Sequence, residues 1–328
     1  MKIAILDDYQ NVGLKLANWK SLPGKHEIDV FTDHISDIDP LVRRLYPYDV
    51  LCVMRERTPL TAQILERLPN LKLIASTGLG NASIDVEAAR SRGIDVMNTG
   101  YASTATIEFT LAMLFAVARH IPQESASVRA GGWQERLGSD LNGKVLGILG
   151  LGHVGSGVAK IALALGMKVV AWSTNLTKER AEEQGVGYVT REELFRQSDY
   201  LSVHLALSDR TRGFVGATDL AMMKSSAYII NTSRGAIFDE VALIRHLEGG
   251  KIAGAALDTF ESEPLPAEHP FRRLPNVIAT PHLGFVSESL YRTFFEDTVS
   301  NIKKWLIARV GCAAKQVRLG SAQTAKRA

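Results

Sequence analysis

The sequence contains few cysteines and no long apolar run, and each shortage excludes a class of protein. Its two cysteines, Cys52 and Cys312, are far apart and belong to no metal or redox motif, so a reducing compartment fits and no metal site is expected. The apolar run after Met1 is too short for a signal peptide, and the apolar stretch at residues 111–118 is too short to span a bilayer. We therefore expect a cytoplasmic protein without a membrane partner.

A large excess of charge is also missing. The 38 Lys and Arg residues only slightly outnumber the 35 Asp and Glu residues. Four of the basic residues lie within residues 311–328, which contain no acid, so the rest of the chain is close to neutral. This segment is rich in Ala, Gly, Ser and Gln and predicts a disordered basic tail. Nothing predicts a folded basic groove, and no nucleic-acid partner is expected.

The sequence does contain a regular alternation of short apolar runs with amphipathic segments. The apolar runs predict buried parallel strands and the segments between them predict helices, so the pattern indicates a doubly wound α/β fold. The length suits two domains. The helix from Thr104 is apolar nearly all round, which predicts burial, including burial between subunits. Strands are predicted at residues 2–6, 49–53, 71–76, 94–97, 144–149, 168–172, 200–204, 227–231, 253–257 and 277–279, and helices at 61–68, 85–92, 104–118, 154–165, 192–197, 240–248 and 287–308.

A glycine-rich loop, Gly150-Leu-Gly152-His153-Val154-Gly155, directly follows the strand predicted at 144–149. In the Gly-x-Gly-x-x-Gly pattern, the first glycine allows a tight turn and the second lets the backbone approach a pyrophosphate. The third lets the following helix pack closely against the strand. The pattern alone also occurs in ordinary turns, but its place between a strand and a helix predicts a dinucleotide site.

The tip of the next strand carries no acid that would choose between NAD and NADP. Ser173 can donate a hydrogen bond to a ribose, but it does not repel a 2′-phosphate. No arginine follows immediately to bind such a phosphate, and the nearest cations are Lys178 and Arg180. NAD is therefore favoured, and NADP stays open.

Three segments further along the chain carry an arginine, a glutamate and a histidine. A guanidinium can hold a substrate carboxylate and polarise a neighbouring carbonyl. An imidazole can move the alcohol proton, and a carboxylate can stabilise the imidazolium. Each of these residues could also have a purely structural role, as a surface arginine, a solvated loop acid or a structural histidine. The segments are Asn231-Thr-Ser-Arg234-Gly235, Asp258-Thr-Phe-Glu-Ser-Glu263-Pro264 and Thr280-Pro-His282-Leu-Gly284.

In combination, these motifs resemble the D-isomer-specific 2-hydroxyacid dehydrogenases, and among them the D-3-phosphoglycerate dehydrogenase-like branch. The resemblance covers residues 1–310. It implies a Rossmann nucleotide-binding domain at residues 100–285, inserted in a flavodoxin-like substrate domain at 1–99 and 286–310. The implied function is NAD(P)-dependent hydride transfer at C2 of a D-2-hydroxy acid or 2-keto acid by a homodimer. Phosphoglycerate and hydroxypyruvate or glyoxylate are the implied kinds of substrate. The alternative is an NAD(H)-sensing, corepressor-like binding protein on the same scaffold.

The resemblance also implies roles for single residues. Arg234, Glu263 and His282 are the expected catalytic residues. Asp258 is expected to bind the nicotinamide carboxamide, and a cap at the end of its strand is the structural alternative. The residues expected to bind the cofactor are Gly150, Gly152, His153, Val154, Gly155, Ser173, Thr232, Ser233, Asp258 and Gly284.

The expected substrate-binding residues lie nearer the N-terminus. Backbone N–H groups in the loop Thr77-Gly78-Leu79 are expected to bind the substrate carboxylate, although a turn alone would account for the glycine. Arg55 is expected to face the substrate, because Arg55-Glu-Arg-Thr58 resembles the Arg-Ser-Arg-Thr of the phosphoglycerate branch. Glu56, however, replaces a hydroxyl that suits a phosphate with a charge that repels one. This difference argues against 3-phosphoglycerate itself.

Overall fold

The computed structural model describes residues 1–324 of the chain. The chain divides into two compact units: unit 1 comprises residues 1–102 and 288–324, and unit 2 comprises residues 103–287. The units divide after residues 102 and 287, whereas the expected divisions follow residues 99 and 285. Each unit is built around one parallel sheet, so the expected two-domain, doubly wound α/β class is confirmed.

The sheet of unit 1 has five parallel strands in the order β2-β1-β3-β4-β5, which is the flavodoxin-like order. Its central strands β3 and β4 are buried along their whole length, as expected for a sheet that is covered on both faces. The strands are β1 (Lys2–Ile5), β2 (Glu27–Val30), β3 (Val50–Val53), β4 (Leu73–Ser76) and β5 (Asp95–Asn98), and the helices are α1 (Gly13–Leu16), η1 (Trp19–Ser21), α2 (Ile38–Leu45), α3 (Ala62–Leu65), α4 (Val86–Ser91) and α12 (Glu288–Thr324).

Four elements of unit 1 were not predicted: the short helices α1 and η1, the edge strand β2 and helix α2. The first three are too short or too charged to show a period, whereas α2 does have an amphipathic pattern. Strand β2 reads Glu-Ile-Asp-Val and lies at the edge of the sheet, where its charged residues remain partly exposed. Helix α2 contains Pro40 within its first turn, a position that tolerates proline because the N–H there has no partner inside the helix. Leu41, Val42 and Leu45 form its buried face.

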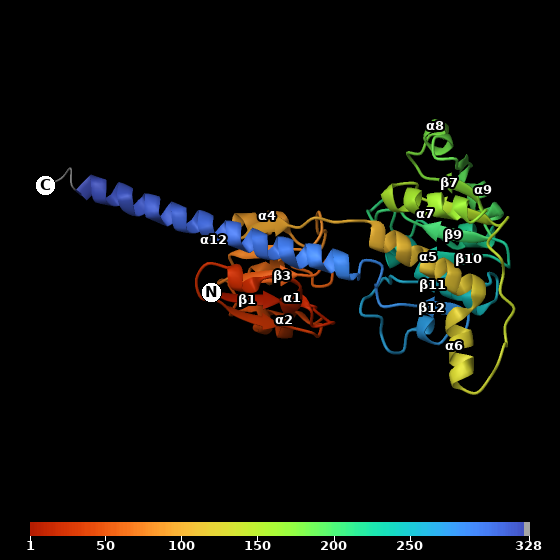
Figure 1. The fold of residues 1–328 in the computed structure, drawn as a ribbon, viewed down its shortest axis with the longest axis horizontal. Coiled ribbons are helices and arrows are strands. Elements are labelled where there is room, and N and C mark those ends of the chain that lie inside the picture. The colour runs from red at the N-terminus through yellow and green to blue at the C-terminus, as the bar shows by residue number, and fades with distance from the viewer. Residues whose placement is uncertain (325–328) are drawn as a thin grey trace. The chain divides into compact units, whose positions relative to one another are not determined.

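Helix α12 packs against α1, β4 and β5 and completes unit 1 (Figure 1). It was predicted to end near residue 308, followed by a disordered tail over 311–328. The structure differs, because the helix continues to Thr324 through most of that segment. The segment contains no proline and is rich in alanine, glutamine and basic residues that favour helix, so its composition is compatible with continuation. Residues 325–328 lie outside the described part of the chain.

The sheet of unit 2 has seven parallel strands in the order β12-β11-β10-β9-β6-β7-β8. Counted from β6, this is the 3-2-1-4-5-6 order of the Rossmann fold with one further strand. The strands are β6 (Val145–Leu149), β7 (Lys168–Trp172), β8 (Gly187–Tyr188), β9 (Tyr200–Val203), β10 (Tyr228–Asn231), β11 (Gly254–Leu257) and β12 (Val277–Ala279). The helices are α5 (Thr104–Arg119), α6 (Ile121–Arg129), α7 (His153–Ala164), α8 (Lys178–Glu182), α9 (Arg191–Gln197), α10 (Ala217–Ala221), η2 (Gly235–Ile237), α11 (Glu240–Glu248) and η3 (Pro270–Arg272).

Successive residues of these strands point to opposite faces of the sheet and join different cores. Ile230 of β10 belongs to the core that α5 and α7 cover, whereas Ile229 belongs to the core beneath α9 and α11. Side-chain caps fix the first residues of helices α9 and α11. Thr190 and Glu193 form a capping box at the start of α9, and Asp239 accepts a hydrogen bond from an N–H in the first turn of α11.

Helix α5 is less uniformly buried than its composition suggested. Its buried residues, which include Thr106, Thr110 and Leu114, form one stripe that packs on α7, β10 and β11 within unit 2, and Figure 1 shows α5 beside α7. Phe115 is exposed on the other side. Among the described residues, no single helix is long and apolar enough to cross a membrane, and α5 with α6 meets that test only as a pair bent by 62°.

Candidate active site

The glycine-rich loop has the geometry that binding of a pyrophosphate requires. Gly150 follows β6 with a φ of +104°, which L-residues rarely adopt, and its N–H donates to the Trp172 carbonyl. A Cβ at Gly155 would collide with the Gly150 carbonyl, so close packing of α7 requires glycine there. A Cβ at Gly152, in contrast, would meet no atom within 4 Å. Open space therefore lies beside the N-terminus of a 12-residue helix, and the loop fits a dinucleotide.

The neighbouring residues of the predicted cofactor site are placed as the loop requires. His153 begins α7 and is exposed, whereas Val154 packs against the core beneath α7. Ser173 directly follows β7, which pairs with β6 in the sheet. These residues therefore surround the carboxyl ends of adjacent strands, where doubly wound sheets bind ligands.

The side chains of Thr232 and Ser233 have structural contacts that the sequence analysis did not anticipate. The Thr232 hydroxyl lies 2.7 Å from the Thr110 hydroxyl, which ties the end of β10 to α5. The Ser233 hydroxyl donates to the Leu205 carbonyl. Nearby, His204 hydrogen-bonds the Ser202 hydroxyl at 2.8 Å, and burial lowers the His204 pKa to about 4, so this histidine is neutral near pH 7. This contact ties the His204 ring to β9.

Asp258 follows β11 and holds the segment that carries His282. Its carboxylate is completely buried and accepts hydrogen bonds from the Thr280 hydroxyl (2.6 Å), the Leu283 N–H (2.7 Å) and the Gly284 N–H (2.8 Å). Its carbonyl accepts from the His282 N–H at 2.9 Å. Burial raises the pKa of Asp258, and these hydrogen bonds with the charge of His282 oppose that rise. The structure thus shows that Asp258 caps the turn beyond the end of its strand. Its contact with a nicotinamide stays a prediction.

Within this turn, His282 adopts the left-handed conformation, with a φ of 55° that is uncommon for a residue with a side chain. Its Nδ1 donates to Glu263 Oε2 across 2.6 Å. Glu263 Oε1 accepts the Phe260 N–H at 2.9 Å, so both carboxylate oxygens have a partner. The structure therefore brings Glu263 and His282 together, as the resemblance implied.

The electrostatics of this pair favour an ionised glutamate. Partial burial tends to raise the Glu263 pKa. The hydrogen bond and charge of His282, the Phe260 N–H and the charge of Arg234 outweigh burial and hold that pKa below its usual value. The anion in turn stabilises the protonated imidazole. Because the Nδ1 atom is committed to Glu263, the Nε2 atom is the one that can exchange a proton with a bound molecule.

Arg234 is brought to the same part of unit 2 by a close approach of two loops. A Cβ at Gly235 would collide with the backbone of Phe260 and Glu261, so the segment after β10 can contact the segment that leads to Glu263 only with glycine there. The Arg234 carbonyl accepts from Asn231 Nδ2 at 3.0 Å, which fixes the backbone of the loop. The need for Gly235 was not predicted, although the motif Arg234-Gly235 contains the signal.

The predicted substrate-binding residues of unit 1 also lie together. The Arg55 N–H donates to the Thr77 hydroxyl at 2.8 Å, and the Arg55 guanidinium donates to the Thr77 carbonyl at 3.3 Å. Gly78 has a φ of +90°, and a Cβ there would collide with that guanidinium. Leu79 is 74% exposed. These residues therefore form one surface at the carboxyl ends of β3 and β4.

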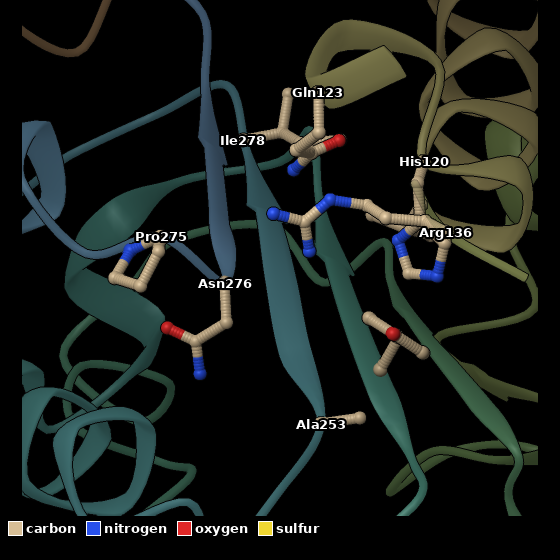
Figure 2. A pocket seen from close by; sticks show the side chains of 9 residues that line it. His120, Gln123, Arg136, Ala253, Pro275, Asn276 and Ile278 are labelled. Carbon is tan, nitrogen blue, oxygen red and sulfur yellow. The ribbon is translucent and has the colours of Figure 1, made fainter. Parts of the chain in front are cut away.

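A cavity of about 160 Å³ lies elsewhere in unit 2 and contains none of the predicted site residues. Tyr228, Ala253 and Asn276 line it at the amino ends of β10, β11 and β12. The glycine-rich loop lies at the opposite, carboxyl ends of the strands. Figure 2 shows His120 and Arg136 beside this cavity. Separately, no group of three or more His, Cys, Asp or Glu side chains in the described part of the chain is arranged to hold a metal ion.

The fold and this arrangement define a nucleotide-binding α/β protein with an ionised acid–histidine pair. A family model described as D-isomer specific 2-hydroxyacid dehydrogenase, NAD binding domain, matches residues 111–284, more than half of the chain. The chain therefore belongs to the D-isomer-specific 2-hydroxyacid dehydrogenase family, as its motifs implied. The matched domain is the one that binds NAD, which agrees with the expected cofactor.

Known relatives agree with this assignment. The chain is 37% identical over 310 residues to a D-3-phosphoglycerate dehydrogenase of Methanocaldococcus jannaschii, with 93% of this chain and 57% of the relative covered. It is 38% identical over 291 residues to a hydroxypyruvate reductase of Thermotoga maritima, with 87% and 93% covered. A phosphoglycerate oxidoreductase structure from Vibrio cholerae superposes with a TM-score of 0.90 at 38% identity, covering 94% of this chain and 99% of that one. The chain thus spans little more than half of the first relative.

The open space at Gly152 makes the cofactor loop testable. We expect Gly152→Val to weaken NADH binding about 100-fold, because a side chain blocks hydrogen bonds to the pyrophosphate that contribute about 1.5–3 kcal/mol each. The fold should be retained, since the φ of −92° suits valine and no neighbour lies within 4 Å. Calorimetric titration with NADH measures the affinity, and thermal unfolding measures the stability.

Gly216→Val is the matched control. Gly216 also precedes a helix in unit 2, has a similar backbone conformation and has no atom within 4 Å of an added Cβ. This variant should bind NADH like the parent protein. Parental NADH affinity in Gly152→Val would show that the pyrophosphate does not contact this loop.

Proposed function

We propose that this protein is an NAD-dependent oxidoreductase that interconverts a D-2-hydroxy acid and the corresponding 2-keto acid by hydride transfer at C2. The observation that carries the proposal is the 2.6 Å contact between His282 Nδ1 and Glu263 Oε2 in a chain of this family. Relatives named as a phosphoglycerate dehydrogenase and a hydroxypyruvate reductase support the 2-hydroxy acid as the class of substrate. NAD, when bound, supplies or accepts the hydride.

Three residues of unit 2 perform the remaining chemistry in this proposal. Arg234 binds the substrate carboxylate and polarises the carbonyl that is reduced. His282 donates the Nε2 proton to the oxygen at C2 during reduction and accepts it during oxidation. Glu263 keeps the imidazole oriented and stabilises its protonated form. Unit 1 serves as the substrate domain, with Arg55 and the backbone of Thr77-Gly78-Leu79 as substrate-binding groups.

The residues that would hold the cofactor come from unit 2. The backbone at Gly150, Gly152, His153, Val154 and Gly155 binds the pyrophosphate, because it borders open space at a helix N-terminus. Ser173 binds the adenosine ribose. The segments that end β10, β11 and β12 bind the nicotinamide part through Thr232, Ser233, Asp258 and Gly284.

The alternative of an NAD(H)-sensing binding protein has less support. The relatives described above carry the names of a dehydrogenase, a reductase and an oxidoreductase. A sensor also has no need for an acid–histidine pair with both carboxylate oxygens satisfied, whereas proton transfer does.

The protein is further proposed to act as a homodimer in the cytoplasm. Unit 2 exposes large apolar side chains in α6 and in the loop that follows it. Among them are Ile121 (52% exposed) of α6 and Trp133 (76%) and Leu137 (95%) of the loop. Exposed apolar residues that are close in the chain support a protein–protein interface. The buried free thiol of Cys52 supports a reducing compartment, which fractionation of the source cells would test.

The Glu263–His282 pair predicts how the reaction depends on pH. Glu263→Gln keeps the size of the side chain but removes the charge that stabilises the imidazolium, so the histidine should lose its proton at a lower pH. Reduction of the keto acid needs imidazolium and should lose activity at a lower pH than in the parent. Oxidation needs the neutral ring and should begin at a lower pH. Profiles of kcat/KM against pH in both directions measure these shifts.

Two further variants distinguish the loss of this charge from the loss of the proton-transfer group and from a general change in the loop. His282→Gln should depress both directions at every pH by roughly 100- to 10,000-fold, with cofactor affinity nearly unchanged. Glu261→Gln, which changes an exposed acid in the same loop, should leave both profiles in place. If Glu263→Gln behaves like Glu261→Gln, the two residues are not coupled and the proposed role of Glu263 is wrong.

The proposed dimer is tested by molar mass in solution. We expect the mass of a dimer from light scattering after size-exclusion chromatography, and a shift towards the monomer for Trp133→Ser with Leu137→Ser, because the change removes two exposed apolar side chains. Tyr46→Ser removes a similarly exposed ring from unit 1 and should not change the mass. A monomer mass for the parent protein would contradict the proposal.

A further inference from the structure

The loop Arg55–Thr58 carries two arginines, but the structure shows that their charges are already engaged. The loop follows β3 and is held on both sides of its first residue. The Arg55 N–H donates to Thr77 Oγ1 (2.8 Å), and the Arg55 carbonyl accepts from Asn81 Nδ2 (2.6 Å). Arg55 has a φ of 52° in this loop. A backbone fixed in this way gives each of the following side chains a defined direction.

Arg57 is directed into contacts within unit 1. Its Nη1 donates to the Asp7 carbonyl at 2.9 Å, and its guanidinium lies 4.5 Å from the centre of the Tyr9 ring. The next residue, Thr58, donates its hydroxyl to the Asp7 carboxylate at 2.6 Å. These contacts bind the second half of the loop to the end of β1, so the Arg57 charge serves the structure of the loop.

Arg55 is compensated by its neighbour in the chain. Its Nη2 atom lies 3.4 Å from Glu56 Oε1, and the two side chains are only 15% and 26% exposed. A partly buried pair is screened less by water and salt than a surface pair. A molecule that binds at this loop therefore meets an arginine together with a carboxylate.

Further acids adjoin the loop. Asp7 and Asp8 are buried at the end of β1, with exposures of 1% and 0%. His34 Nδ1 contacts the Asp7 carboxylate at 2.9 Å, and the Asp8 carboxylate accepts the N–H of Gly13 at 2.7 Å. Arg55 is thus paired with Glu56, while Arg57 donates to a backbone carbonyl next to two buried carboxylates. A phosphate dianion is bound best by cations that are not already paired with a carboxylate.

We infer that Glu56 is a specificity-determining residue that selects 2-keto acids without a phosphate group. The inference rests on the proposed function and on Arg55 facing the substrate. A phosphate on C3 of the substrate would meet the Glu56 carboxylate beside Arg55 and be repelled. A C3 hydroxyl, in contrast, can donate a hydrogen bond to that carboxylate. The preferred substrate is therefore a short 2-keto acid with a neutral polar group at C3.

The test compares hydroxypyruvate with 3-phosphohydroxypyruvate, which differ only in the phosphate, as substrates for reduction with NADH. The parent protein should prefer hydroxypyruvate in kcat/KM by about 100-fold or more. Glu56→Gln and Glu56→Ser should raise kcat/KM for the phosphorylated acid about 10- to 100-fold, since they remove the repelling charge. Glu87→Gln, which changes an exposed acid on α4, should leave the ratio of the two substrates unchanged.

A second measurement needs no variant. If repulsion between Glu56 and the phosphate lowers kcat/KM for the phosphorylated acid, added salt should screen that repulsion. In the parent protein, salt should then raise kcat/KM for the phosphorylated acid relative to that for hydroxypyruvate. A parental preference for the phosphorylated acid would overturn the inference, as would a substrate ratio that neither Glu56 variant nor salt changes. Inactivity on hydroxypyruvate with activity on other 2-keto acids would overturn the inference alone, whereas failure of the parent protein to reduce any 2-keto acid in a panel with NADH would refute the proposed function, and the inference with it.

Discussion

The buried carboxylate of Asp258 determines where the histidine of the candidate active site lies. Three donors from residues 280–284 converge on this carboxylate, and its own carbonyl accepts the His282 N–H. The turn made in this way holds His282 in a left-handed conformation that a free chain rarely adopts. The Thr280 carbonyl, which also accepts the His282 N–H, and the edge-on contact of the Phe285 ring with the imidazole add to this support. The proposed chemistry of unit 2 therefore depends on a carboxylate that need not touch the substrate.

The two acids of this region differ in environment and therefore in role. Asp258 is fully buried, which raises its pKa, and its oxygens are occupied by the turn. Glu263 keeps 30% of its side-chain exposure, and its contacts with His282 and the Phe260 N–H outweigh burial and lower its pKa. The aspartate thus shapes the site, and the glutamate supplies a stable negative charge beside the imidazole. In unit 1, Glu56 likewise supplies a partly buried negative charge, which pairs with the Arg55 guanidinium.

The sequence predicted what depends on local pattern and missed what depends on distant contacts. Buried strands and the helices between them follow from apolar periodicity, so both sheets were anticipated. The edge strand β2 and the five-residue helices α8 and α10 were missed, because each is too short or too charged to show a period. Helices α2 and α6 were also missed, although they are eight and nine residues long. The Glu263–His282 contact followed from a resemblance to known motifs. The cap by Asp258 and the Thr110–Thr232 contact join residues far apart in the chain, and no spacing rule reveals them.

The most direct test of the role of Asp258 is the turnover of Asp258→Asn compared with its affinity for NADH. Asparagine keeps the shape of the side chain but replaces one accepting oxygen with a donor, so at least one N–H or hydroxyl of the turn loses its partner. If the residue positions His282, kcat should fall about 10- to 100-fold while the NADH dissociation constant changes less than about threefold. An unchanged kcat would contradict this positioning role. A loss of NADH affinity as large as the loss of turnover would also contradict it, and would favour direct contact with the nicotinamide.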